Sequence, residues 1–477
     1  MRAERTKSLM IAGGVVVLIV IATVVAVLLF NIDAYKSKIE TAASEATGLD
    51  VKITGKMGLS FFPFGISAKD IHVANKGGEI LLLERLKLRA ELVPLLKKQL
   101  KVTGCELVKP AVTIVKDAEG KYNFESTEKK SAKGGWGTAF SLNELKLSKG
   151  ALVYLDKRTG VRTELKEINL AIGDLSAAGI SGDSIKNVSF TGRFDCKELL
   201  REGLRIENLR APVKADKGVF FLNPLTMDVF GGKGEGDFTA DDSGADIAYK
   251  LNVKVSKLDF EKLEEFFGTK KLIRGKGELS ASLTVKEKRG RILMSNLDGT
   301  FALRGDNLVT HTMDLDKVLS KYETSQKFHL ADLVAFFFVG PLGTVALKGY
   351  RYGDVYYQTQ GGQGAITQFI SHWKIQNGQA DAADCALATH HNRVALIGKL
   401  NLVSERFDHV TVALLDDKGC PTFKQTISGS FDSPRAGTVS SVESLAGPLF
   451  DLYRKAKRFA QAGKCEVFYT GAVQQPR

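Results

Sequence analysis

Two groups of residues have types and spacing that could support chemistry, but the sequence around each group argues against a functional site. Cys385, His390 and His391 carry atoms that bind metals, but the Cys-x4-His-His spacing matches no common site, and adjacent residues of a strand point to opposite faces. The glycine-rich segment 231–236 looks like a phosphate loop. Such a loop precedes a helix N-terminus, whereas residues 237–240 have the pattern of a strand. We therefore predict no metal site and no cofactor.

Acidic pairs and nucleophile motifs give no catalytic candidate either. Asp241–Asp242 and Glu264–Glu265 lie where solvated turns or helices are expected. The sequence has no Gly-x-Ser-x-Gly elbow, no His-Glu-x-x-His helix and no EF-hand loop. We predict no catalytic residue and a protein that is not an enzyme. A metal bound at Cys385 and His390 would revive the enzymatic alternative, an envelope hydrolase.

One uncharged block near the N-terminus indicates the compartment. Residues 9–30 carry no charge, and about 20 apolar residues suffice for a membrane-spanning helix. The alternative is a cleaved signal, but its apolar region is roughly 7–15 residues long, and segment 31–35 is a poor cleavage site. We predict an uncleaved anchor that includes Leu9, Ile11, Val16, Leu18, Val24, Leu28 and Phe30.

Charges on the two sides of this block predict its orientation. Arg2, Arg5 and Lys7 precede it, whereas Asp33 and Glu40 dilute the basic residues that follow. The positive-inside rule then places the N-terminus in the cytoplasm. We predict a single-pass protein of the bacterial inner membrane with its bulk in the periplasm.

Beyond residue 50, apolar and polar residues alternate with a period of two. This period predicts strands with one apolar and one wet face, and clean alternation is typical of antiparallel sheet. The same alternation fits an open curved sheet or a closed sandwich, whose two apolar faces cover each other. The clearest runs are Val51–Phe61, Leu86–Leu92, Tyr249–Val255, Leu279–Val285 and Val410–Leu414.

Helices are few and turns punctuate the strands. Residues 156–160, Asp-Lys-Arg-Thr-Gly, predict a hairpin turn, because Gly supplies a positive φ and Asp bonds back to the backbone. A helical stalk is predicted over 32–47, with Gly48 as its stop. The other candidate helices are 92–100, 314–322, 365–373 and 442–462.

Composition, charge and boundaries complete the outline. With 44% hydrophobic residues the chain is not disordered. The net charge of +13 suggests nucleic-acid binding, but the predicted periplasmic location excludes nucleic acid as a partner. An anionic membrane surface suits the basic helix 442–462 better.

The predicted divisions are a cytoplasmic tip and anchor (1–30), an N-terminal β unit with its stalk (31–125), a flexible linker (126–137), a middle β unit (138–290), a C-terminal β unit (291–440) and a basic helix with the tail (441–477).

The five cysteines are far apart and odd in number. An oxidising compartment permits one or two disulfides and leaves at least one thiol free. Cys420 and Cys465 flank the final segment, so a disulfide between them would tie down the C-terminal end. The alternative is that these thiols are buried and unpaired.

Several segments carry a family resemblance. Residues 47–56 form a β-strand that ends in Gly, residues 59–75 have a Pro-containing turn before a strand that ends in Asn, and residues 107–124 contain a Pro-strand-Gly-x-x-Asn hairpin. With Val-Pro-Leu-Leu-Lys at 93–97, this order resembles the N-terminal region of the AsmA family of bacterial envelope proteins. Residues 230–236 and 378–415 are similar to later parts of the family.

The resemblance implies a fold. Family members are anchored in the inner membrane and project a β-rich periplasmic body. They resemble bridge-like lipid carriers, whose curved sheets form a taco-shaped groove with an apolar floor. The expected fold is thus mainly β: an elongated, curved antiparallel sheet with a taco-like groove and a few short helices, preceded by one transmembrane helix.

The resemblance also implies a function in phospholipid traffic and outer-membrane assembly. It implies no catalytic residue. We expect the chain to bind or transfer phospholipid, with Leu251, Val253 and Leu283 facing the lipid. Its expected partners are phospholipid, the inner membrane and outer-membrane assembly proteins, without nucleic acid. The alternative is a non-lipid scaffold that assists outer-membrane proteins through exposed strand edges.

Overall fold

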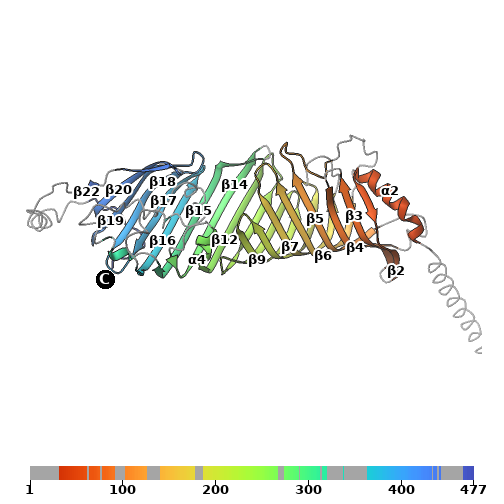
Figure 1. The fold of residues 1–477 in the computed structure, drawn as a ribbon, viewed down its shortest axis with the longest axis horizontal. Coiled ribbons are helices and arrows are strands. Elements are labelled where there is room, and N and C mark those ends of the chain that lie inside the picture. The colour runs from red at the N-terminus through yellow and green to blue at the C-terminus, as the bar shows by residue number, and fades with distance from the viewer. Residues whose placement is uncertain are drawn as a thin grey trace, which may run out of the picture. The chain divides into compact units, whose positions relative to one another are not determined.

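The structure is a computed structural model, drawn in Figure 1. The chain forms two compact units, residues 1–181 and 182–477, and the division falls inside the predicted middle unit 138–290. The structure describes residues 32–61, 64–75, 78–91, 102–125, 140–177, 186–266, 273–288, 291–311, 314–317, 319, 337, 362–431, 433–437, 440–441 and 466–476.

The first unit is a mixed sheet preceded by a short helix. Strands β1 and β2 both pair with β3, and the order then runs β3, β4, β5, β6, β7. Every pair is antiparallel except β5–β6, which is parallel. The elements are η1 (Ile32–Tyr35), α2 (Lys36–Thr47), β1 (Asp50–Ile53), β2 (Met57–Phe61), β3 (Phe64–Asn75), β4 (Gly78–Ala90), β5 (Val102–Lys116), β6 (Phe140–Asp156) and β7 (Arg162–Ala177).

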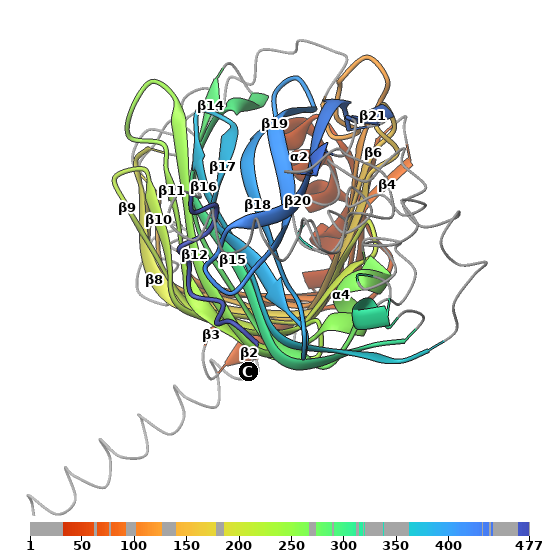
Figure 2. The ribbon, with the colours of Figure 1, turned by 90° about the vertical axis from the view of Figure 1, so that its left-hand side faces the viewer.

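The second unit is an antiparallel sheet in which most sequence neighbours pair. The exceptions are β13, which pairs with β15 so that β14 follows β12, and β22, which pairs with β20. Figure 2 shows these strands bending, with α4 on the inner side of the bend. The elements are β8 (Val188–Arg201), β9 (Leu204–Asp216), β10 (Val219–Val229), β11 (Gly232–Asp241), β12 (Ile247–Asp259), α4 (Phe260–Phe266), β13 (Ile273–Arg274), β14 (Lys276–Lys288), β15 (Arg291–Thr310), β16 (Gly364–Gln376), β17 (Gln379–Ala388), β18 (Arg393–Asn401), β19 (Arg406–Leu415), β20 (Pro421–Ser430), β21 (Ser433–Ala436) and β22 (Ser440–Ser441).

The mainly β fold and the predicted alternation are confirmed. Leu251 of β12 lies opposite Leu283 of β14, and the next residue of β12, Asn252, lies opposite Ser282. Because successive side chains point to opposite faces, the leucines share one face and the polar pair shares the other.

The apolar side chains of the first unit stay on one face although the sequence changes parity. In β5, Leu107 stands at an odd position and Val112 at an even one. Lys109 between them has φ 49°, and Lys149, at the same level of the paired strand β6, has φ 52°. A left-handed residue interrupts the alternation of a strand, and the register of β5 with β4 and β6 continues unbroken through it. Leu107 and Val112 therefore stay on the same side of the sheet.

The glycine-rich segment 231–236 is a hairpin and a strand, as its flanks predicted. Gly231 has φ 70° in the turn between β10 and β11, and Gly232 starts β11. A Cβ at Gly236 would overlap the backbone oxygen of Asn252 on β12. Glycine is needed here because the neighbouring backbone approaches too closely for a side chain.

Two of the helix predictions can be compared with the structure in full. The predicted stalk is η1 followed by α2, and Gly48 caps it in the left-handed conformation at φ 70°. The helix predicted over 365–373 is wrong, because these residues belong to β16. Ser371 occupies a buried position of that strand, its hydroxyl bonded to the Phe337 carbonyl, and this polar residue hides the period of two.

The remaining helix predictions fall wholly or partly outside the described residues. Segments 92–100 and 442–462 lie outside, as do the linker 126–137 and the anchor 9–30. Of segment 314–322, residues 315–317 and 319 are helical. Among the described helices, none has the length and apolar character needed to cross a membrane.

Helix α2 covers the first edge of the sheet. The outward-facing amides of Val51 and Ile53 on β1 donate to Ser44 Oγ at 2.9 Å and to Glu40 Oε1 at 2.6 Å. The Met57 amide of β2 donates to Asp33 Oδ1 at 2.9 Å. Unpaired strand edges invite pairing with other chains, and these side chains satisfy the edge donors instead.

The last edge of the second unit is also occupied. β20 pairs with β21 along residues 427–430 and with β22 at residues 423 and 424. Between these two segments the Gly437 amide donates to the Thr426 carbonyl. The chain therefore folds back over its own final strand.

The C-terminal residues 466–476 cross the face of the second unit opposite the main core as a strap. Tyr469 and Val473 lie on a row of small side chains that includes Ala386 and Ala395. The Tyr469 hydroxyl donates to Asp384 Oδ1 at 2.5 Å. This strap buries a second, smaller apolar cluster on β17–β19.

Glu40 provides a test of edge protection. We predict that Glu40→Ala lowers the free energy of unfolding by about 1 kcal/mol, the usual net contribution of one hydrogen bond. Urea denaturation measures this loss, and hydrogen exchange should accelerate at the Ile53 amide. Glu40→Gln keeps an oxygen acceptor and should lose less, and Glu45→Ala, on an exposed position of α2, should change neither quantity. Unchanged exchange at Ile53 in Glu40→Ala would contradict the assignment.

Candidate functional site

The residues with metal-binding atoms are not gathered into a site. Cys385 is buried in β17, where its thiol bonds to the His372 carbonyl and burial raises its pKa. His390 and His391 lie in the exposed turn that follows β17. Among the described residues, no group of three or more His, Cys, Asp or Glu side chains could hold a metal ion.

The acidic pairs have structural partners. Asp241 Oδ1 accepts hydrogen bonds from the amide and hydroxyl of Ser243 within a turn. Glu264 is fully buried on α4, and its carboxylate accepts the Ile273 amide at 3.2 Å. These contacts account for both carboxylates without any reaction.

The first unit displays an apolar face that crosses neighbouring strands. In register, Leu88 of β4 lies beside Cys105 of β5, which lies beside Leu145 of β6 and then Ile172 of β7. A second row runs parallel to it through Leu86, Leu107, Leu147 and Leu170. All of these side chains except the buried Ile172 are only half-buried. No described element covers them in the way that α4 covers part of the second unit.

Cys105 places a thiol in the middle of this face. The thiol is free and half-buried, and burial raises its pKa above the ordinary value of 9.0. The free thiols of Cys196 and Cys385 are buried at 1% exposure. Cys420 is in a disulfide, whereas Cys465 lies outside the described residues, so the Cys420–Cys465 pairing stays a prediction.

The second unit has the same kind of face at the predicted residues. Phe238 of β11, Leu251 of β12 and Leu283 of β14 form one row, and Val253 lies in the next row beside Ala281. Leu251, Val253 and Leu283 are half-buried. The structure therefore brings the three predicted residues together on one apolar surface, and their contact with lipid stays a prediction.

Towards its C-terminal strands the same face is closed. Phe301, Phe369 and Trp373 are at most 2% exposed. Phe260 and Leu263 of α4 pack on this part of the sheet, as do Leu315, Leu319 and Phe337. The second unit thus has an open stretch around Phe238, Leu251 and Leu283. Val255 and Leu279, further along β12 and β14, are already buried with the strands from β15 onwards.

The opposite face of the first unit is held by ion pairs. Arg89 of β4 reaches across β5 to Glu144 of β6, with 2.5 Å between Nη2 and the carboxylate, and Lys146 binds the other oxygen of Glu144. A Cβ at Gly104, on the strand between them, would lie 3.4 Å from the Arg89 side chain. The Arg89 side chain thus passes over Gly104 and ties β4 to the parallel pair β5–β6.

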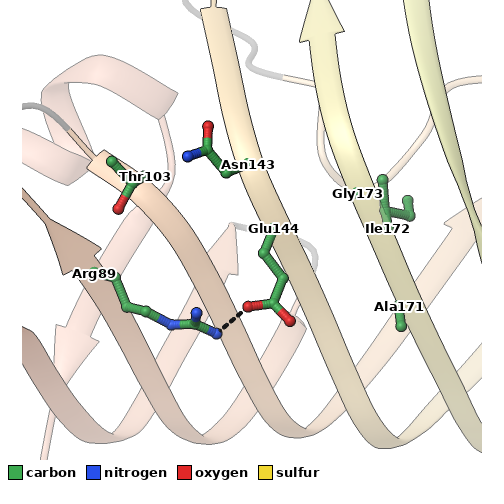
Figure 3. A pocket seen from close by; sticks show the side chains of 7 residues that line it. All are labelled: Arg89, Thr103, Asn143, Glu144, Ala171, Ile172 and Gly173. Carbon is green, nitrogen blue, oxygen red and sulfur yellow. Dashed lines mark ion pairs between the residues drawn. The ribbon is translucent and has the colours of Figure 1, made fainter. Parts of the chain in front are cut away.

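These residues border a shallow depression of about 460 Å³, which Figure 3 shows with Arg89 and Glu144 pointing toward each other. Thr103 and residues 171–173 of β7 line its other sides. The Arg89 and Glu144 charges are paired, so the depression offers no free cation for an anionic ligand. Sequence reasoning missed both this pair and the apolar rows around Cys105. The alternation over 85–92 was their only signal.

Two asparagines of the family-like segments meet in the structure. Asn75, at the end of β3, donates from Nδ2 to the backbone carbonyl of Asn123 at 3.0 Å. The Asn123 side chain in turn binds the backbone of β5, accepting from Val115 and donating to Thr113. These residues fix the turn after β5 against the ends of β3 and β5.

Comparison with known proteins gives one family. The model of the AsmA family matches residues 1–201 and 187–385. No curated protein and no solved structure matches the chain. The matched residues include the open apolar rows of both units.

Glu144 makes the first unit acid-sensitive. The hydrogen bond from Lys146, followed by the bond and charge of Arg89, holds the pKa of Glu144 below its ordinary value of 4.5. Such a carboxylate contributes stability that is present above pH 4.5 and is lost as the pH falls through the folded-state pKa. We expect urea denaturation at stepped pH to show a steeper acid loss for the native chain than for Glu144→Gln. Equal acid dependence in both proteins would disprove this role.

Proposed function

The chain belongs to the AsmA family, and on this premise we propose that it binds phospholipid acyl chains on the open apolar faces of its sheets. Membership of the family associates the chain with envelope assembly or lipid transport. The observation that supports lipid as the ligand is the pair of in-register apolar rows around Cys105, which are half-buried without a described covering element. Contiguous apolar surface of this kind usually marks a binding surface.

The chemistry of these rows suits an acyl chain. Leu86, Leu88, Leu107 and Leu145 offer methyl groups and no hydrogen-bonding groups to a ligand. Each methylene group moved from water into such surroundings gains about 0.8 kcal/mol, so a ligand with a long hydrocarbon chain gains most. The gain needs no specific polar contact, which fits binding of a lipid class rather than of a single molecule.

We further propose where this binding takes place and what it serves. The uncharged block 9–30 anchors the chain in the bacterial inner membrane, with the sheets in the periplasm. There the protein carries or holds phospholipid for the outer membrane and supports its assembly. It acts by binding rather than by catalysis.

The scaffold alternative depended on exposed strand edges, and the two described edges give it no support. Asp33, Glu40 and Ser44 bind the outward amides of β1 and β2, and β21 and β22 pair with β20. A partner strand would have to displace these contacts first. We therefore rank lipid binding above strand-edge recruitment of outer-membrane proteins.

Leu283 tests the lipid-binding proposal. We predict that Leu283→Asp reduces retained phospholipid at least about tenfold, a change of 1.4 kcal/mol, because a carboxylate on the apolar face must be desolvated beneath an acyl chain. Native mass spectrometry of the full chain after mild detergent extraction measures the bound lipid. Leu251→Asp should act in the same direction.

A matched control separates this effect from general damage to the strand. Thr284 is the next residue of β14 and lies exposed on the opposite face, opposite Lys250. Thr284→Asp should therefore leave lipid binding unchanged. Equal losses in Leu283→Asp and Thr284→Asp, or a native chain that carries no lipid and does not crosslink to acyl-chain probes, would refute the proposal.

Cys105 serves as a native reporter in the first unit. We predict that a maleimide modifies Cys105 in the lipid-free chain and that phospholipid slows this reaction several-fold, because an acyl chain would cover the thiol. Peptide mapping by mass spectrometry follows each cysteine separately. Cys196 and Cys385 are buried, so their modification would report unfolding. A rate at Cys105 that is the same with and without lipid would exclude lipid from this face.

A further inference from the structure

One row of the second unit ends in two aromatic side chains. The row crosses five paired strands, from Gly236 of β11 through Val253, Ala281 and Phe301 to Trp373 of β16. Exposure falls in the same direction: Val253 is half-buried, whereas Ala281, Phe301 and Trp373 are 9%, 2% and 0% exposed. On this row the half-buried part of the apolar face thus ends at Val253 of β12, and the residues from Ala281 of β14 to Trp373 of β16 are buried.

The aromatic residues at the end of this row are locked in place. The Trp373 indole donates from Nε1 to Ser371 Oγ at 2.8 Å, and that hydroxyl donates to the Phe337 carbonyl at 2.6 Å. The Phe337 ring stacks on Phe369 with 6.0 Å between centroids. The indole N–H and the Ser371 hydroxyl thus both have hydrogen-bond partners within the protein, so neither group needs contact with water.

Helix α4 closes the same region from the inner side. The Phe260 ring meets Phe369 edge-on, with 6.0 Å between centroids. It lies over Gly277 and Gly305, where a Cβ would come within 3.0 Å of the ring. The two glycines therefore admit an aromatic ring between helix and sheet, and the ring fills the space in which a ligand would continue.

We propose that these aromatic residues form an end stop for the acyl chain on the second unit, a proposal that rests on the lipid-binding function above. A chain lying on β11–β14 meets the Phe301 and Trp373 rings and cannot pass, because a close-packed interior has no void to receive it. The surface between the open edge and this wall then sets which acyl-chain lengths fit. The second unit holds its lipid against a closed end.

Two substitutions change the size of the end stop in opposite directions. Ala281→Leu adds bulk on the open side of Phe301 and should shift binding to shorter acyl chains. Phe301→Leu makes the wall smaller and should admit longer ones. Ser280→Leu adds the same bulk on the exposed opposite face, opposite Lys254, and serves as the control. Far-ultraviolet circular dichroism and thermal denaturation check that each full-length variant is folded.

The measurement uses a series of phosphatidylethanolamines that differ only in acyl-chain length, competed for the full chain and read by native mass spectrometry. A several-fold shift in preferred length for either folded variant, with none for Ser280→Leu, supports the end stop. Unchanged preference in both variants, or an equal loss for every length, overturns it. If the native chain binds no member of the series, the proposed lipid-binding function itself fails, so the two failures are distinguishable.

Discussion

The backbone hydrogen-bond ladder between neighbouring strands is the interaction on which the other features depend. It holds residues opposite one another in register, so each apolar side chain extends the row of the strand before it. The row from Leu88 through Cys105 to Leu145 exists only because three strands keep that register. A slip of one residue would turn every apolar side chain to the wet face. The left-handed residues Lys109 and Lys149 stand at the same level of β5 and β6, so the register continues where the sequence changes parity.

A sheet with one apolar face must either cover that face or leave it available, and this protein does both. In the second unit, Phe260 and Phe337 cover the strands from β15 onwards, and the strap through Tyr469 covers their other side. The first unit has no described counterpart over its leucine rows. Its stability rests on the ladder, on a buried cluster that includes Ile53, Ile71 and Leu83, and on the helix that covers its edge. Leu86 and Leu107 pack against this cluster with only part of their surface, so the apolar rows remain half-buried.

Much of this architecture was accessible from the sequence, and the exceptions have physical causes. The alternation around Leu251 and Leu283 predicted strands and their common face, and Gly48 predicted the end of α2, because both signals are local. The strand over 365–373 was missed because Ser371 takes a core position with its hydroxyl satisfied by a distant carbonyl. The pairing of Arg89 with Glu144 was missed for the same kind of reason: it joins β4 to β6, which are separated in the sequence by residues 91–139, and no local pattern links the two strands. Parallel pairing of β5 and β6 was likewise not predictable, because neither strand alone has a sequence pattern that reveals the direction of its partner.

The C-terminal strap has a consequence for the order in which the molecule can be built. Most strands pair with their sequence neighbours, so contacts are local and the sheet can grow strand by strand as the chain lengthens. Asp384 and Arg393 bind Tyr469 and Val473, which follow them in the chain by 85 and 80 residues. Until residues 466–476 are in place, the alanine row of β17–β19 is bare. A chain without this strap would therefore keep its sheet-forming sequence and present an unfinished surface, on which quality control could distinguish it from the native fold.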